Sequence, residues 1–142
     1  MNRLEQLWLK GKDFLGVEYP IMAGAMTWIS DHKLVSAVSN AGGFGCLAAG
    51  NLPPDILVEE IDKTRRLTDK PFATNLITIA PNYRQHLEIA VEKKVPFIIF
   101  AGSFPRIGDQ DRQTERRQSD GFRFERVHCQ KDDQFGCGRI DA

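Results

Sequence analysis

Apolar residues follow two alternating patterns through the first 106 residues of the chain. Short, nearly continuous apolar runs are separated by longer stretches in which apolar residues recur every three or four positions. A short run bounded by glycine or proline is typical of a strand buried on both faces, and the recurring spacing is typical of an amphipathic helix. Strands are therefore predicted at residues 17–23, 43–50, 71–79 and 97–102.

Helices are predicted between these strands, after a short amphipathic helix at residues 4–9. Ser30 is predicted to cap the first of them, with Asp31 in the first turn, where a carboxylate is favourable. The pair Pro53-Pro54 suits the start of the second helix, and Asn82 is predicted to cap the third. The residues expected on the buried faces are Leu34, Val35, Val38 and Ala41, then Ile56, Leu57, Ile61 and Thr64, then Tyr83, Leu87, Ala90 and Val91.

This alternation of strands and helices predicts an α/β fold with a parallel sheet and right-handed crossovers. A (β/α)8 barrel and a doubly wound sheet both begin in this way, and both bind ligands at the carboxyl ends of their strands. Three of the four strand ends, at residues 23–26, 48–51 and 101–103, are rich in glycine and other small residues. The remaining end offers a lone amide side chain, Asn75. No nucleophile and base occur together at any strand end.

Charge and cysteine content exclude several classes of function. The net charge of the 142 residues is zero, so nothing attracts the chain generally to nucleic acid or to an anionic membrane. No apolar run is long enough to span a bilayer, and the N-terminus does not read as a secretory signal. The three cysteines, Cys46, Cys129 and Cys137, form no disulfide framework, which favours a reducing, cytoplasmic location. Cys46 is expected to be an inert buried thiol, and His128 beside Cys129 fits no zinc spacing, so no metal site is predicted.

The composition changes sharply after about residue 106. Residues 107–142 hold six of the eleven arginines and none of the leucines, with acidic residues interleaved among the basic ones. Their few apolar residues do not offset the entropy of ordering the segment, so a mostly disordered tail is predicted. Codons permitted for this tail, read one base later, can encode a helix–strand–helix–strand pattern. We therefore interpret the tail as out of frame, and sequencing the gene around the Arg106 codon tests this.

Three segments of the chain resemble one family of enzymes, in order and at close spacing. They combine a "YPI-x-x-G-x-M" start, an "AVSNAGG-x-G" helix end and an "LTDKPF-x-x-N" strand entry. The segments are "YPIMAGAMTWISDHKLVSAVSNAGGFGCLAAGN", "LTDKPFATNLITIAPNY" and "VPFIIFAGSFP". From about residue 17 to residue 105, the chain resembles nitronate monooxygenases, once called 2-nitropropane dioxygenases, and the related FMN-dependent enoyl-acyl-carrier-protein reductases.

The resemblance implies that residues 1–106 are the N-terminal half of a (β/α)8 TIM barrel, with about four strands and three helices. It implies that FMN binds at the carboxyl ends of the strands. The residues implied at the flavin are Ala23, Gly24, Ala25, Met26 and Asn75, and those implied at the substrate are Ala101 and Gly102. In this chain Ala25 replaces a usual glycine, which could crowd the ring, and "FATN" replaces "FGVN". The family's catalytic histidine and its flavin phosphate site lie further downstream, so no catalytic residue is predicted here.

The function implied is oxidation of alkyl nitronates by molecular oxygen, with a small-molecule substrate, O2 as co-substrate and FMN as cofactor. An FMN-dependent enoyl-acyl-carrier-protein reductase and a truncated product without enzymatic activity are the alternatives, and this chain as translated is expected to be inactive. Read without the resemblance, Gly24 lies in a strand-end turn, Met26 is a core methionine, and Asn75 pairs with backbone. His32 and His86 are predicted to be solvated helix residues without a carboxylate partner.

Overall fold

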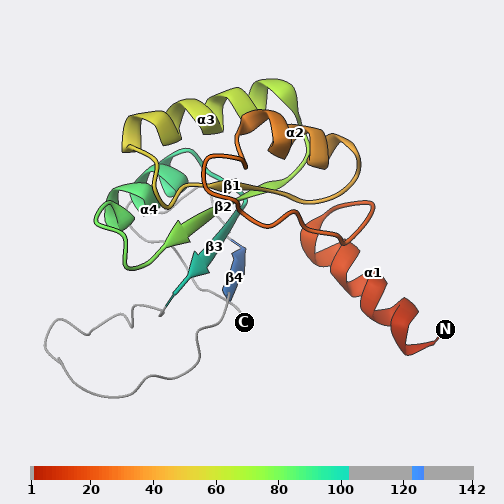
Figure 1. Cartoon of the computed structure of the whole chain (residues 1–142). Coiled ribbons are helices and arrows are strands. Elements are labelled where there is room, and N and C mark those ends of the chain that lie inside the picture. Colours follow the sequence, from red (N-terminus) through yellow and green to blue (C-terminus); the bar gives the residue numbers. More distant parts are fainter. Residues whose placement is uncertain (1, 103–122, 127–142) are drawn as a thin grey trace, which may run out of the picture.

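A computed structural model of the chain describes residues 2–102 and 123–126 (Figure 1). Its helices are α1 (Arg3–Leu15), α2 (His32–Asn40), α3 (Pro54–Leu67) and α4 (Tyr83–Glu92). Its strands are β1 (Gly45–Ala48), β2 (Phe72–Ile77), β3 (Phe97–Ala101) and β4 (Arg123–Arg126). They form a sheet in the order β1-β2-β3-β4, in which β1, β2 and β3 are parallel and β4 is antiparallel to β3. The predicted α/β alternation is confirmed from β1 to β3.

The first predicted strand, at residues 17–23, is reduced to a single parallel bridge to Phe44. Beside the bridge, the Phe44 N–H donates to the Ile21 carbonyl at 2.9 Å, and the Ala23 N–H donates to the Phe44 carbonyl at 3.0 Å. Pro20 has no N–H with which to extend this ladder, and the chain turns away after Ala23. The prediction of a full strand was therefore wrong, although the segment does lie beside the start of β1.

Helices α2, α3 and α4 pack on one face of the sheet, as Figure 1 shows. We call the face that these helices cover the outer face. Successive residues of a strand point to opposite faces, and the parallel register places Leu47, Thr74 and Ile98 together on the outer face. The buried residues of the outer cluster are Val35, Leu47, Ala49, Leu57, Ile61, Phe72, Leu76, Ala90, Val95, Ile98 and Phe100. Each predicted helical face contributes to this cluster, through Val35 of α2, Leu57 and Ile61 of α3, and Ala90 of α4. Ala41, which was also predicted on the buried face, is exposed and lies just beyond the end of α2.

A smaller cluster occupies the inner face of the sheet. Its buried residues are Leu15, Phe44, Cys46, Ala73, Phe97 and Ile99. At the amino ends of the strands, the Phe97 ring lies edge-on to Phe44 at 5.1 Å and to Phe14 of α1 at 5.8 Å. The remainder of α1 extends away from the sheet (Figure 1), and its Leu4 and Leu7 side chains are exposed. Helix α1 is therefore longer than predicted, and its C-terminal end covers part of the inner face.

The helix starts agree only partly with the predicted caps. Asp31, rather than Ser30, caps α2, because its carboxylate accepts the N–H groups of Lys33 and Leu34, both at 3.0 Å. Pro54 begins α3 as predicted. Asn82 occupies the cap position of α4, but its side chain makes no capping hydrogen bond. The order of residues predicted each helix start within a residue, whereas the identity of the capping side chain depended on the turn that precedes it.

Strand β4 lies inside the segment for which a mostly disordered tail, without any strand, was predicted. It pairs Arg123–Arg126 antiparallel with β3, with Phe97 opposite Arg126 and Phe100 opposite Arg123. The remainder of the predicted tail lies outside the described residues.

The Cys46 thiol is buried on the inner face, as expected. Burial raises the pKa of this thiol to about 12, because the thiolate loses its hydration, so the group stays protonated and unreactive near neutral pH. Among the described residues, no helix combines the length and the apolar character needed to cross a membrane.

Candidate functional site

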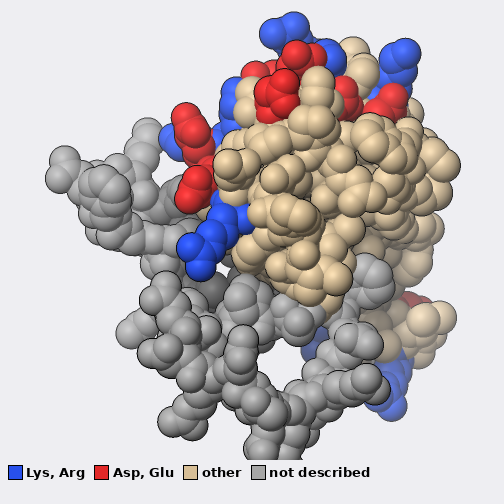
Figure 2. Space-filling view, turned by 60° about the vertical axis from the view of Figure 1, so that its left-hand side comes forward, with Lys and Arg blue, Asp and Glu red and all other residues tan. Residues whose placement is uncertain are grey.

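The carboxyl ends of the parallel strands form an edge without charged side chains. No Asp, Glu, Lys or Arg occurs in the segments 19–30, 44–54 and 71–83, which contain the Phe44 bridge, the ends of β1 and β2 and the turns that follow them, or in residues 95–105, which contain the end of β3. Figure 2 brings forward the side to which the β2 arrow points in Figure 1, and it shows a broad surface free of charge there. Such a surface favours an apolar or uncharged ligand over a free ion.

A turn at this edge follows the Phe44 bridge and carries Gly24. The Ser30 hydroxyl accepts the Met26 N–H at 2.9 Å and donates to the Gly24 carbonyl at 3.2 Å, which closes the turn on itself. Among the described residues, the N–H groups of Gly24 and Ala25 have no hydrogen-bond partner. A Cβ added at Gly24 would meet no atom of the described part of the chain within 4 Å. The turn therefore presents two adjacent unpaired donors beside open space.

The two residues after Gly24 face different surroundings. Ala25 is half-buried, and its side chain packs against the inner cluster. Met26 is 45% exposed, so it is not the core methionine of the simpler interpretation. Trp28, a little further on, has a φ of 65° and is 71% exposed. The turn thus carries large apolar side chains that the described residues leave uncovered.

Asn75 lies on the inner side of β2, in register with Ala48 and Ile99. It is 8% exposed, and its Nδ2 donates to the Ile99 carbonyl at 3.4 Å. This is the backbone pairing expected without a ligand, and at that length the bond is weak. A stronger acceptor at this edge could compete for the amide.

The ends of β2 and β3 are tied together beside Gly102. The Ala101 carbonyl accepts the Thr78 N–H at 3.0 Å and the Thr78 hydroxyl at 3.3 Å. Gly102 has a φ of +108°, and a Cβ there would lie 2.7 Å from the Thr78 hydroxyl oxygen. Glycine is therefore required at this strand end for both conformation and space.

The parallel register brings the predicted site residues to one edge of the sheet. Ala23 to Met26, Asn75, Ala101 and Gly102 all lie there, in three separate segments of the chain. Sequence reasoning missed Ser30 and Thr78, which hold two of these segments in place. Thr78 directly follows β2 and Ser30 lies in the turn before α2. Hydroxyl residues in such positions often bond to nearby backbone, and this was the available signal.

The histidine predictions were both wrong. His32 was predicted to lack a carboxylate partner, but its Nδ1 lies 2.8 Å from Glu60 Oε2 of α3. His86 was predicted to be solvated, but it is 1% exposed on the inward side of α4. Its Nε2 lies 2.9 Å from the Leu52 carbonyl, which can only accept, so the ring carries a proton on Nε2. Helix α4 thereby holds the loop between β1 and α3.

Stability should depend on pH through His86. Burial lowers the pKa of His86 below its ordinary 6.5, and the buried Nδ1 has no partner among the described residues to accept a proton from it. The unfolded chain then binds more protons than the folded chain, so the free energy of unfolding falls as pH drops below about 6.5. Urea unfolding at pH 7 and pH 5 measures this. His86→Gln, which keeps a donor for Leu52, should lose less stability over that interval, and an equal loss in both proteins would contradict the assignment.

Comparison with known proteins agrees with this geometry. The sequence model of the family described as nitronate monooxygenase matches residues 10–96. A (3aS,4S,5R,7aS)-5-hydroxy-7a-methyl-1-oxo-octahydro-1H-indene-4-carboxyl-CoA dehydrogenase of Mycobacterium tuberculosis is 35% identical over 89 residues, which are 63% of this chain and 25% of that protein. A probable nitronate monooxygenase of Staphylococcus haemolyticus is 37% identical over 78 residues, which are 55% of this chain and 21% of that protein.

Solved structures show the same likeness. FabK from Thermotoga maritima has a TM-score of 0.65 and 37% identity over 66% of this chain and 30% of FabK. A nitroalkane oxidase from Streptomyces ansochromogenes has a TM-score of 0.62 and 25% identity over 67% of this chain and 37% of that structure. The chain spans about a quarter of the length of the curated relatives. Between the two folds that the sequence left open, these neighbours select a partial (β/α)8 barrel. Because the family match covers more than half of the chain, the protein belongs to the nitronate monooxygenase family.

Proposed function

We propose that the chain derives from an FMN-dependent oxidoreductase that oxidises alkyl nitronates with molecular oxygen, and that the chain as translated is itself inactive. Membership of an oxidoreductase family supports this proposal. The observation that carries it is the open turn at Gly24, where two adjacent N–H groups have no partner within residues 2–102 and 123–126, at an uncharged strand edge. When bound, FMN would supply the electron transfer, and the protein's part is to bind, orient and shield the reactants.

The residues at this edge fit the flavin ring better than the flavin phosphate. The Gly24 and Ala25 N–H groups can donate to heteroatoms at the rim of a ring, and the open space beside Gly24 allows a close approach. Met26 would cover the ring, and the Asn75 amide would add a hydrogen bond. No cation lies in the segments 19–30, 44–54 and 71–83 to bind a phosphate.

We place the proposed substrate-binding site at the end of β3. Ala101 and Gly102 present backbone with little side-chain bulk, and Thr78 holds them in place. A small apolar nitronate chain would suit this uncharged edge. The strand-end segments supply neither a histidine nor a carboxylate as a base. We therefore propose that this chain binds FMN weakly and does not turn over nitronate, which keeps a non-enzymatic product as an alternative.

A second candidate, redox chemistry on an acyl thioester, is favoured by one finding. A relative from Mycobacterium tuberculosis, 35% identical over the matched segment, is named as a dehydrogenase of a carboxyl-CoA compound. An enoyl-acyl-carrier-protein reductase also acts on an acyl thioester. Oxygen consumption with an alkyl nitronate supports the first candidate, and NAD(P)H consumption with an enoyl thioester supports the second.

Binding of FMN to the full chain tests the proposed site directly. We expect weak, saturable quenching of flavin fluorescence, with a shift of the visible flavin spectrum. Gly24→Val should weaken this binding at least tenfold, because its side chain would fill the open space beside the unpaired N–H groups. Leu4→Ala, at an exposed position of α1, is the control and should bind FMN as the parent chain does. Binding that Gly24→Val leaves unchanged, or no saturable binding, would contradict the proposed site.

A further inference from the structure

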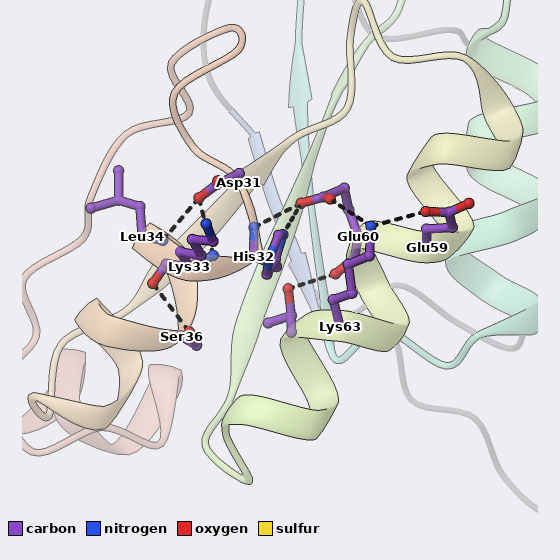
Figure 3. Close-up of polar contacts among 9 residues, drawn as sticks. Asp31, His32, Lys33, Leu34, Ser36, Glu59, Glu60 and Lys63 are labelled. Atoms are coloured by element: carbon purple, nitrogen blue, oxygen red, sulfur yellow. Dashed lines mark hydrogen bonds and ion pairs between the residues drawn. The ribbon is translucent and has the colours of Figure 1, made fainter.

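Glu60 is a buried carboxylate that binds one residue twice. It lies on α3, and its side chain is 12% exposed. Its Oε2 accepts the backbone N–H of His32 at 2.8 Å and also contacts His32 Nδ1 at 2.8 Å (Figure 3). Lys63 lies further away, with its Nζ 3.7 Å from Glu60 Oε1. A carboxylate buried to this degree is stable only when it is hydrogen-bonded, so the contact to His32 is a defined part of the fold.

This contact fixes the start of α2. His32 is the first residue of the helix, where backbone N–H groups lack partners within the helix. Glu60 accepts the N–H of His32, and Asp31 accepts those of Lys33 and Leu34. Negative charge is also favourable at a helix N-terminus. As Figure 3 shows, the two carboxylates meet the helix start from different elements, so α3 determines where α2 begins.

The start of α2 in turn positions the turn that carries Gly24. Ser30 lies two residues before His32, and its hydroxyl closes that turn. The Ser30 carbonyl also accepts the Ala48 N–H at 3.2 Å at the end of β1. Between these contacts, Trp28 has a φ of 65°, a strained conformation for a residue with a large side chain. Because Trp28 is 71% exposed, packing of its side chain does not maintain this conformation.

We infer that Glu60 is a positioning residue for this turn. Glu60 binds both the backbone N–H and the ring of His32, and so it anchors the C-terminal end of residues 24–31. The bridge to Phe44 anchors the N-terminal end. A strained turn held at both ends keeps the Gly24 and Ala25 donors in one arrangement before a ligand arrives. Such preorganisation strengthens binding, because less entropy is lost on association. The role in ligand binding rests on the proposed function of the turn, whereas the anchoring does not.

Glu59 provides a matched control on the same helix. It carries the same charge one residue earlier, its side chain is 58% exposed, and Lys63 lies 2.9 Å away at the i,i+4 position. Exposed pairs of this kind contribute little to stability. Glu59→Ala and Glu60→Ala change the net charge equally, so a difference between them reports the contact to His32.

Hydrogen exchange of the full chain tests the anchoring without any ligand. In Glu60→Ala, amide exchange in residues 24–32 should rise at least roughly tenfold, because hydrogen bonds to a buried charged group are lost. Glu59→Ala should stay within about twofold of the parent chain, and exchange in β2 should be unchanged in both. Glu60→Gln keeps an acceptor oxygen and should restore most of the protection. His32→Leu keeps the backbone bond alone and should give an intermediate result.

Flavin titration of the same variants tests the link to binding. Glu60→Ala should weaken FMN binding at least tenfold, with Glu60→Gln close to the parent chain and Glu59→Ala unchanged. Equal exchange in Glu59→Ala and Glu60→Ala, or a rise spread evenly over β2 and residues 24–32, overturns the anchoring role. A local rise in exchange with unchanged FMN affinity overturns the role in binding. If the parent chain itself does not bind FMN, the proposed function fails, while the exchange result still decides whether Glu60 anchors the turn.

Discussion

Replacing Phe44 with alanine is expected to lower the free energy of unfolding by about 3–5 kcal/mol, the usual cost of truncating a buried aromatic residue. The Phe44 side chain is fully buried, and its ring lies edge-on to Phe97 at 5.1 Å. Its backbone also holds the segment that leads to Gly24, through the bonds to Ile21 and Ala23. The substitution should therefore leave a cavity in the inner cluster and loosen the adjoining turn.

Urea unfolding followed by far-UV circular dichroism measures the effect of Phe44→Ala. Phe44→Leu keeps most of the apolar volume and should cost much less, about 1 kcal/mol. Leu4→Ala, at a position that is 72% exposed, is the surface control and should change stability by less than about 0.5 kcal/mol. If Phe44→Ala were no more destabilising than Leu4→Ala, the inner cluster would not be a folded core.

Gly45→Ala is expected to destabilise the chain by about 2–3 kcal/mol through overpacking. A Cβ at Gly45 would lie 2.5 Å from the Val35 carbonyl oxygen and 3.0 Å from the Ser39 hydroxyl oxygen of α2. The carbonyl belongs to the helix backbone, so α2 must move away from β1 before the methyl group fits. Such a shift would also weaken the bond at 3.3 Å from the Gly45 N–H to the Ser39 hydroxyl.

Gly24→Ala is the matched control for this experiment, because a Cβ there meets no atom within 4 Å. Its free energy of unfolding should stay within about 0.5 kcal/mol of the parent value. The comparison separates crowding at β1 from the general effect of replacing glycine in the unfolded chain. Equal losses of stability in the two variants would show that α2 does not pack against β1 as closely as the structure has it.

The helices and the central strands could be predicted because their signals are local. The spacing of Val35, Leu57, Ile61 and Ala90 predicted the buried helical faces, and all four lie in the outer cluster. The apolar runs predicted β1, β2 and β3, whose residues are buried from both sides. Parallel order then placed the strand ends, and with them Asn75, at a common edge.

The predictions for His32, for His86 and for Ser30 as a cap were wrong because each depended on contacts with other parts of the fold. Nothing near His32 in sequence indicates that Glu60 of α3 lies beside it, and nothing near His86 indicates that Leu52 covers it. Ser30 has the side chain of a helix cap, but the turn before α2 takes up its hydroxyl. In each case the hydrogen-bond partner of the side chain depends on how the helices, strands and turns pack.

Residue type and local spacing were sufficient to predict the alternation of strands and helices from β1 to β3, the apolar faces of the helices and the uncharged character of the strand ends. Three other features follow from packing in three dimensions: the single bridge formed by residues 17–23, the antiparallel direction of β4, and the contact of Glu60 with the start of α2. These features join segments far apart in the chain. A hydrogen bond between such segments depends on how the helices and strands pack against one another. The local spacing of residues does not determine that packing.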